Sequence, residues 1–149
     1  MGPIEYIRRW WQSRGFGVQS HTDFEYLHEV LRQPLDYYAY ASIASPRARL
    51  IYRICNAAKK GRVAFVGCFS PEELQAASMA MGQTVASVDS LLHLHGVDTL
   101  LISGIDGEHA ELWQQILQTT CITWDMRTLG LAQFLPNRYA EHYSILPVS

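Results

Sequence analysis

Residues that could do chemistry follow two short apolar runs of this chain, at 63–66 and 98–102. The first run is followed by Gly67, Cys68 and Ser70, and the second by Ser103, Gly104 and Asp106. Short apolar runs are typical of strands that are buried on both faces of a parallel sheet. Because ligands of such sheets bind beyond the carboxyl ends of the strands, these residues form the predicted ligand site.

Each of these segments leads into a predicted helix, whose free N–H groups can meet an anion or a hydroxyl. Ser70, Pro71 and Glu73 match a capping box, and Asp106 is suited to cap the second helix. The first segment lacks the spaced glycines that bring a nucleotide close to the backbone, and Pro71 offers no N–H. An ordinary capped turn therefore explains it better than a nucleotide loop.

The three cysteines, Cys55, Cys68 and Cys121, are widely spaced and form no CxxC motif. We expect buried thiols in a reducing compartment. Cys68 lies near a predicted helix N-terminus, where the pKa of a thiol is lowered, but a buried and inert thiol is the favoured interpretation.

The histidines form no recognisable metal set. His93 and His95 are two residues apart and would face opposite sides of a helix, so no zinc site is expected. His109 follows Asp106 by three residues and could pair with it. Such a pair on a first helical turn is more often structural than catalytic.

Local signals predict the elements that position these residues. We expect a helix over 4–13 that carries Ile4, Ile7, Trp10 and Trp11, and a second helix that is capped by Asp23 and ended by Pro34. Further helices are expected from Ser45-Pro46 to Gly61, over 71–81, over 90–95, and after Asp106 as a cap. The expected strands cover 63–66, 84–88, 98–102, 121–124, 129–134 and 142–146, with Pro136-Asn137 as the turn between the last two. This order predicts an α/β fold with a mostly parallel sheet and an antiparallel hairpin at one edge.

Length and composition predict one globular unit, with a helical arm over 1–44 and a Rossmann-like domain over 45–149. The chain has 149 residues, of which 48% are apolar and 17% charged. Its net charge of -2 argues against nucleic acid as a partner. No apolar run approaches the ~20 residues that cross a bilayer. Without a signal peptide at the N-terminus, we expect a cytoplasmic protein with no membrane partner.

Two further clusters are predicted to be structural. The first is basic and is expected to form a solvated helix face; it comprises Arg47, Arg49, Arg53, Lys59, Lys60 and Arg62. The second, Tyr37, Tyr38 and Tyr40, is expected to pack the arm onto the domain with hydroxyls at the edge.

Six segments resemble, in the same order, class I S-adenosylmethionine-dependent methyltransferases of the O-methyltransferase-like kind found in Bacteroidetes-type bacteria. Residues 15–24 are similar to that family's GHGVHSPF arm with two residues inserted, 37–40 to YYAY, 49–67 to LLYRLVNYFRPKRILELG, 98–112 to DLVFIDGNHRYEATL, 124–131 to IDLFDLGL and 142–145 to HYTI. The resemblance implies a three-layer Rossmann-like fold.

The departures from the family fall on its working parts. Phe65 and Ser103 stand where the family has acidic residues, and Pro71 stands where it has a second loop glycine. The 31 steps from Gly67 to Asp98 suit one βαβ crossover of about 30 residues, so a strand that ends in the ribose-binding acid is missing. A further strand–helix unit is missing before Cys121.

Together these features predict a degenerate methyltransferase-like domain that transfers no methyl group and acts through protein binding or as a subunit, such as a homodimer. No cofactor is expected; if the ancestral site survives, S-adenosylmethionine or S-adenosylhomocysteine would lie against Gly67, Cys68, Ser70, Ser103, Gly104 and Asp106. Two alternatives stay open. One is an active small-molecule O-methyltransferase that uses Gly67, Ser70, Ser103 and Asp106. The other is a small-ligand or phosphate-binding module at the helix near Ser70.

Overall fold

The computed structural model describes residues 1–34, 36–58, 61–82, 96–119, 121–135 and 137–147. Its helical elements are α1 (Pro3–Ser13), α2 (His21–Tyr26), the π-helical turn η1 (Leu27–Leu31), the 3-10 helix η2 (Tyr38–Ser42), α3 (Pro46–Ala57), α4 (Pro71–Met81) and α5 (Ala110–Leu117). Its strands are β1 (Val63–Val66), β2 (Thr99–Ser103), β3 (Ile122–Met126), β4 (Leu129–Gln133) and β5 (Glu141–Ser144). The strand and helix predicted over 84–95 lie outside the described residues.

The described strands form one mixed sheet in the order β1-β2-β4-β3-β5. β1 is parallel to β2 and β3 is parallel to β5, whereas β4 is antiparallel to both of its neighbours. The α/β class is confirmed, but the predicted hairpin of the last two strands is wrong. In the described sheet β5 lies parallel to β3 and not beside β4, and the antiparallel hairpin is formed by β3 and β4, inside the sheet. The reason is burial: four of the five residues of β4 are buried, whereas β5 begins with the exposed Glu141 and His142 and suits an edge.

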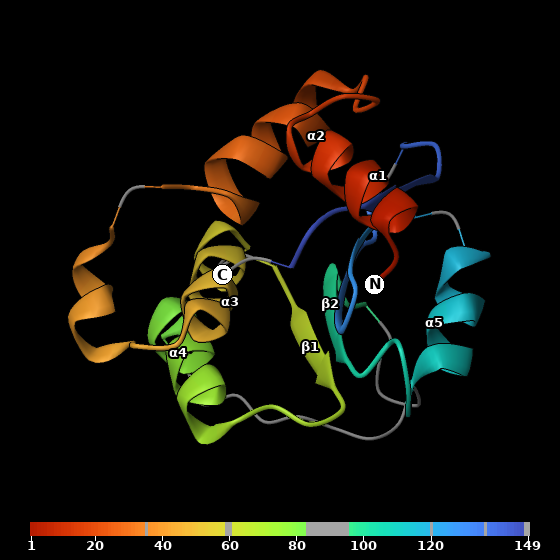
Figure 1. Cartoon of the computed structure of the whole chain (residues 1–149). Helices are drawn as coiled ribbons and strands as arrows, with labels where there is room; N and C mark the ends of the chain where they lie inside the picture. Colours follow the sequence, from red (N-terminus) through yellow and green to blue (C-terminus); the bar gives the residue numbers. More distant parts are fainter. Residues whose placement is uncertain (35, 59–60, 83–95, 120, 136, 148–149) are drawn as a thin grey trace.

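Helices cover both faces of the sheet (Figure 1). Phe65 and Leu101 face α3 and α4, where they share a core with Ile51. Their neighbours along the strands point the other way: Ile102 packs with Trp113 of α5. This alternation follows from the period of two in a strand. It leaves the carboxyl ends of β1 and β2 between α3, α4 and the loop that precedes α5.

The basic cluster of α3 is not a solvated face, so that prediction is wrong. Arg53 is 6% exposed and donates to the carbonyl oxygens of Val30 and Leu31 (2.6 and 2.9 Å) and to the hydroxyl of Tyr40 (3.0 Å). A guanidinium carries five N–H donors, which suits the free carbonyls at the end of η1. Arg53 thereby fastens the N-terminal arm to the domain, while Lys59 and Lys60 lie outside the described residues.

The tyrosine cluster packs as expected at two of its three positions. Tyr37 and Tyr40 pack edge-on against Tyr52 of α3 and, with tilted rings, against each other, with ring centroids 5.5–6.1 Å apart. Tyr38 is fully exposed. The 3-10 geometry of η2 accounts for this, because residues 37 and 40 eclipse at a period of three whereas residue 38 points away.

Two of the four predicted helix caps are confirmed. Ser45 accepts from the N–H of Ala48, and Ser70 forms the full capping box with Glu73. Asp23 is not a cap, because Ser20 caps α2. Asp23 is buried and its carboxylate accepts hydrogen bonds from Arg138 and from the hydroxyl of Tyr143, both at 2.8 Å. Burial and this carboxylate raise the pKa of Tyr143.

Among the described residues, no helix combines the length and the apolar character that crossing a bilayer requires.

Candidate functional site

The two predicted segments do meet, and Gly67 lies at their contact. Its φ of +98° is strained for any residue with a side chain. A Cβ built at this position would be 2.8 Å from the carbonyl oxygen of Ser103 and 3.2 Å from the ring of His109. A glycine lets other groups approach its backbone closely. Here the carbonyl of Ser103 and the ring of His109 make that approach, in place of a ligand.

Arg47 of α3 fills the space beside this contact. Its Nη2 donates to Ser103 Oγ at 2.9 Å, and its Nε lies 2.7 Å from Glu73 Oε2. The guanidinium also lies 5.5 Å from the ring centroid of Phe69. The Nε and Oε2 atoms are both buried, and each has the other as its charged partner. We name Arg47, Phe69, Glu73 and Ser103 the Arg47 network.

The N-terminus of α4 is occupied by carboxylates of its own first turn. Glu73 accepts from the N–H of Ser70 at 2.9 Å, and Ser70 Oγ accepts from the N–H of Glu73 at 3.1 Å. Glu72 accepts from the N–H groups of Ala44 and Ser45 at 3.1 and 2.7 Å. A bound phosphate would meet two negative charges here, and one of the N–H groups it needs is already bonded.

Phe65 is a core residue at the position where the family has an acid. It is 1% exposed, and its ring packs edge-on against Phe69 with centroids 5.3 Å apart. Position 65 therefore offers no polar group to a ligand near Gly67. The aromatic pair extends the core to the point where β1 ends.

Asp106 does not cap a helix, which corrects the prediction. It is exposed, and α5 begins only at Ala110, after a turn closed by the N–H groups of Gly107 and His109 on the carbonyl of Gly104. His109 does not pair with Asp106; its Nδ1 lies 3.1 Å from the carbonyl oxygen of Ser103. Gly104, with a φ of +78°, allows the extra turn, and that turn places Asp106 outside the helix.

Cys68 is exposed, so the prediction of a buried thiol is wrong at this position; Cys55 and Cys121 are buried. Burial raises the pKa of the Cys55 thiol to about 12 and also raises the pKa of Cys121. Cys68 lies in the turn between β1 and α4.

This difference predicts the reactivity of the thiols. At about pH 8 we expect one thiol of the folded protein to react with Ellman's reagent within minutes, and the other two only after denaturation, because the thiolate is the reactive form. The Cys68→Ser variant should lose the fast phase. A fast phase that persists in this variant would contradict the burial of Cys55 and Cys121.

Sequence reasoning missed Arg47 as the central residue of this region. Its place in a first helical turn, directly after Ser45-Pro46, was predictable, but its partners Glu73 and Ser103 come from two other elements. Gly104 is also held by distant residues, since its N–H donates to the carbonyl of Thr128 at 2.8 Å. Contacts between elements carry no local sequence signal.

The described residues contain no group of three or more His, Cys, Asp and Glu side chains placed to hold a metal ion. One cavity of about 210 Å³ that they border lies at the opposite, amino-terminal ends of β1 and β2, against Gly61, Asp98 and Thr99. Comparison of the chain with protein-family models, curated proteins and solved structures finds no match.

Proposed function

We propose that this protein is a reduced methyltransferase-like domain that does not use S-adenosylmethionine and acts by binding. The observation that carries the proposal is the Arg47 network. It joins α3, α4 and the end of β2 at the place where the family resemblance puts the cofactor, and it is closed by an ion pair of 2.7 Å.

The residues at this place do not fit the cofactor. The ribose hydroxyls need an acceptor, and the methionine end needs close approach to the backbone. Phe65 is buried in the core and offers no acceptor, and Gly67 is covered by His109 and Ser103. Ser103 Oγ is bonded to Arg47, so it too is engaged. The acceptor for the ribose and the room for the methionine end are both missing at this place. This favours a domain that no longer binds the cofactor.

The two alternatives receive no specific support. An atypical methyltransferase would need Ser70, Ser103 and Asp106 around one cavity. Ser70 is instead part of the capping box, Ser103 bonds to Arg47, and Asp106 is exposed on a turn. A phosphate module would need a free end at α4, where Glu72 and Glu73 already lie.

Isothermal titration tests the proposal. Neither S-adenosylmethionine nor S-adenosylhomocysteine should release measurable heat at ligand concentrations up to about 1 mM, which bounds the binding free energy near -4 kcal/mol. A known methyltransferase titrated in the same buffer is the positive control. Micromolar binding of either ligand would overturn the proposal.

The Arg47→Ala variant separates blockage from lost recognition. If the network merely blocks a surviving site, removing the guanidinium should restore binding. We expect no binding, because Phe65 still occupies the position of the acid. Thermal unfolding of the variant shows whether the fold is retained.

A further inference from the structure

Helix α1 lies on the protein with its polar side inward. Arg9 and Ser13 are 5% and 4% exposed, whereas Ile4, Ile7 and Trp11 are 83%, 59% and 50% exposed. Residues three and four apart share a helix face, so the apolar residues form one stripe on the outer side. An amphipathic helix of a globular protein ordinarily buries its apolar stripe.

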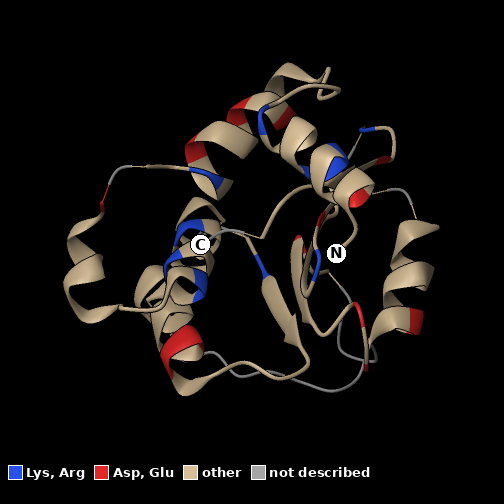
Figure 2. Ribbon diagram, in the orientation of Figure 1, with Lys and Arg blue, Asp and Glu red and all other residues tan. Residues whose placement is uncertain are grey.

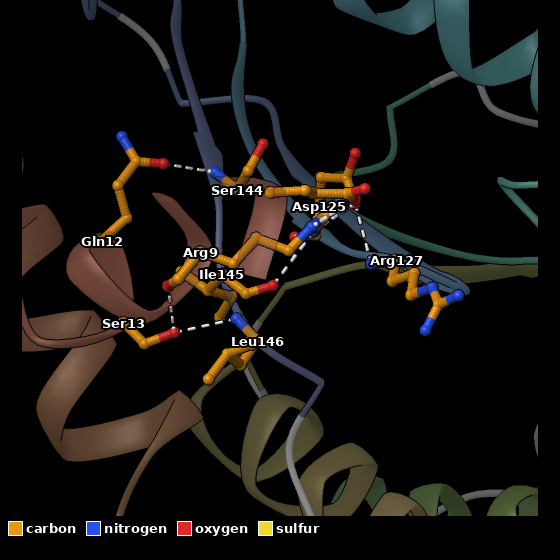
Figure 3. A network of polar contacts seen from close by, with 9 residues as sticks. Arg9, Gln12, Ser13, Asp125, Arg127, Ser144, Ile145 and Leu146 are labelled. Atoms are coloured by element: carbon orange, nitrogen blue, oxygen red, sulfur yellow. Dashed lines mark hydrogen bonds and ion pairs between the residues drawn. The ribbon is translucent and has the colours of Figure 1, made fainter. Parts of the chain in front are cut away.

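Specific hydrogen bonds hold α1 in this orientation (Figure 3). Arg9 Nη1 donates to the carbonyl oxygens of Asp125 and Ile145 at 2.9 and 3.1 Å, and to the carboxylate of Asp125 at 3.0 Å. Gln12 accepts from the N–H of Ser144 at 2.7 Å, and Ser13 accepts from the N–H of Leu146 at 2.8 Å.

The inward face is thus fixed by the strand ends of β3 and β5. Ile4, Ile7, Trp10 and Trp11 are presented to the outside, and we name them the α1 stripe. The stripe is continued by Phe16, whose ring lies 4.4 Å from that of Trp11 and which is 49% exposed. Contiguous exposed apolar patches rimmed by polar residues mark interaction sites.

A basic cavity adjoins the α1 stripe. It has a volume of about 370 Å³ and is lined by Trp10, Ser13, Arg14, His28, Arg32 and Leu146. Trp10 belongs to both the stripe and the cavity, and Arg14 lies over the ring of Trp10 at 5.1 Å from its centroid. Nε2 of His28 is buried and has no hydrogen-bond partner among the described residues. Burial, together with the charges of Arg14 and Arg53, lowers the pKa of Arg32.

The lining of the cavity is positive, because it contains Arg14 and Arg32 and no carboxylate. Over residues 1–34 as a whole, four arginines balance four carboxylates. In the described chain Arg8, Arg14 and Arg32 form no ion pair, whereas Glu5 pairs with Arg9, Glu25 with His21 and Asp23 with Arg138. Glu25, whose partner is a histidine, and Glu29 are the carboxylates of α1, α2 and η1 that pair with no arginine within the described residues. Figure 2 shows the basic residues in blue on α1 and beyond the end of η1.

We propose that the α1 stripe and the basic cavity together bind the surface of an anionic membrane. Tryptophan and isoleucine enter the boundary between headgroups and acyl chains, and arginines meet the lipid phosphates. The cavity beside Trp10 places two arginines and a histidine next to the α1 stripe, where a lipid headgroup would lie. This binding needs no spanning segment, but it departs from the expectation, drawn from the sequence, of a protein with no membrane partner.

Charge favours a membrane over a second copy of this chain. A two-fold interface centred on the cavity is self-complementary, so it would bring Arg14 and Arg32 of both copies into one contact. An anionic lipid surface instead neutralises them. The proposal is independent of the loss of cofactor binding, because vesicle binding is measured without S-adenosylmethionine.

Vesicle co-sedimentation of the full chain tests this. We expect at least tenfold stronger partition to phosphatidylcholine vesicles that contain about one third phosphatidylglycerol than to phosphatidylcholine alone. The emission of Trp10 and Trp11 should shift to the blue on binding. The other two tryptophans, Trp113 and Trp124, are 3% and 0% exposed and add no such signal.

Paired variants assign the two parts of the surface. Ile4→Ser with Ile7→Ser should weaken partition at least tenfold, and so should Arg14→Gln with Arg32→Gln. The matched control is Tyr38→Ser, which removes an exposed aromatic residue from η2 and should leave partition unchanged. Circular dichroism confirms that each variant is folded.

Three results would overturn the proposal. The first is no preference for anionic vesicles. The second is a dimer in analytical ultracentrifugation that depends on Ile4 and Ile7, without vesicle binding, which would make a second copy the occupant. The third is saturable binding of soluble glycerol phosphate that depends on Arg14 and Arg32, again without vesicle binding, which would indicate a small-ligand site.

Discussion

Replacing Gly67 by alanine is expected to destabilise the protein by about 2–4 kcal/mol, as the sum of backbone strain and overpacking. The strain arises because φ is +98° at this residue. The overpacking arises because the new Cβ would lie 2.8 Å from the backbone oxygen of Ser103, which cannot rotate away. To relieve it, β2 or the turn after it must move, and this would disturb the Arg47 network.

Two other glycines separate these causes. Gly82 also has a positive φ, of +69°, but a Cβ there meets no atom of the described residues within 4 Å. Gly82→Ala should therefore cost about 1 kcal/mol from strain alone. Gly107 has neither a positive φ nor a close neighbour, so Gly107→Ala should be close to neutral. Urea unfolding followed by circular dichroism measures all three. Equal costs at Gly67 and Gly82 would show that Gly67 has no close contact.

The elements of this fold that could be predicted are those with local causes. Ser45 and Ser70 cap α3 and α4 as expected, since a serine followed by proline determines a helix start within a few residues. The buried strands β1 and β2 follow from their short apolar runs. The strand ends therefore met as predicted, and Gly67 and Ser103 lie together.

The failures have non-local causes. Asp106 looked like a cap, but the backbone makes a further turn before α5. The place of β4 inside the sheet depends on which strands lie beside it, and pairing partners are distant in sequence. The roles of Arg47 and Arg53 depend on carbonyl, hydroxyl and carboxylate groups from other elements. An arginine on a predicted helix is ordinarily solvated, so sequence alone favoured the wrong environment.

Arg53 offers the second large effect. Arg53→Met keeps an unbranched apolar stem of similar length, but it removes three hydrogen bonds to Val30, Leu31 and Tyr40. We expect a loss of about 3–5 kcal/mol, because the carbonyls at the end of η1 become buried acceptors without a donor. Thermal and urea unfolding measure the loss, and the N-terminal arm should become more accessible to proteases.

Milder variants show which bonds matter. Tyr40→Phe removes one acceptor and should cost about 1 kcal/mol. Arg53→Lys keeps the charge, but a single ammonium cannot reach carbonyls and a hydroxyl on different sides as a planar guanidinium does, so its effect should lie between the two. Buried charged groups can sometimes be replaced by apolar residues without loss. If Arg53→Met leaves the stability unchanged, the carbonyls of Val30 and Leu31 must find other donors. Apolar packing of Leu27 and Leu31 would then hold the arm in place. A large loss of stability would instead show that the buried guanidinium of Arg53 couples the N-terminal arm to α3.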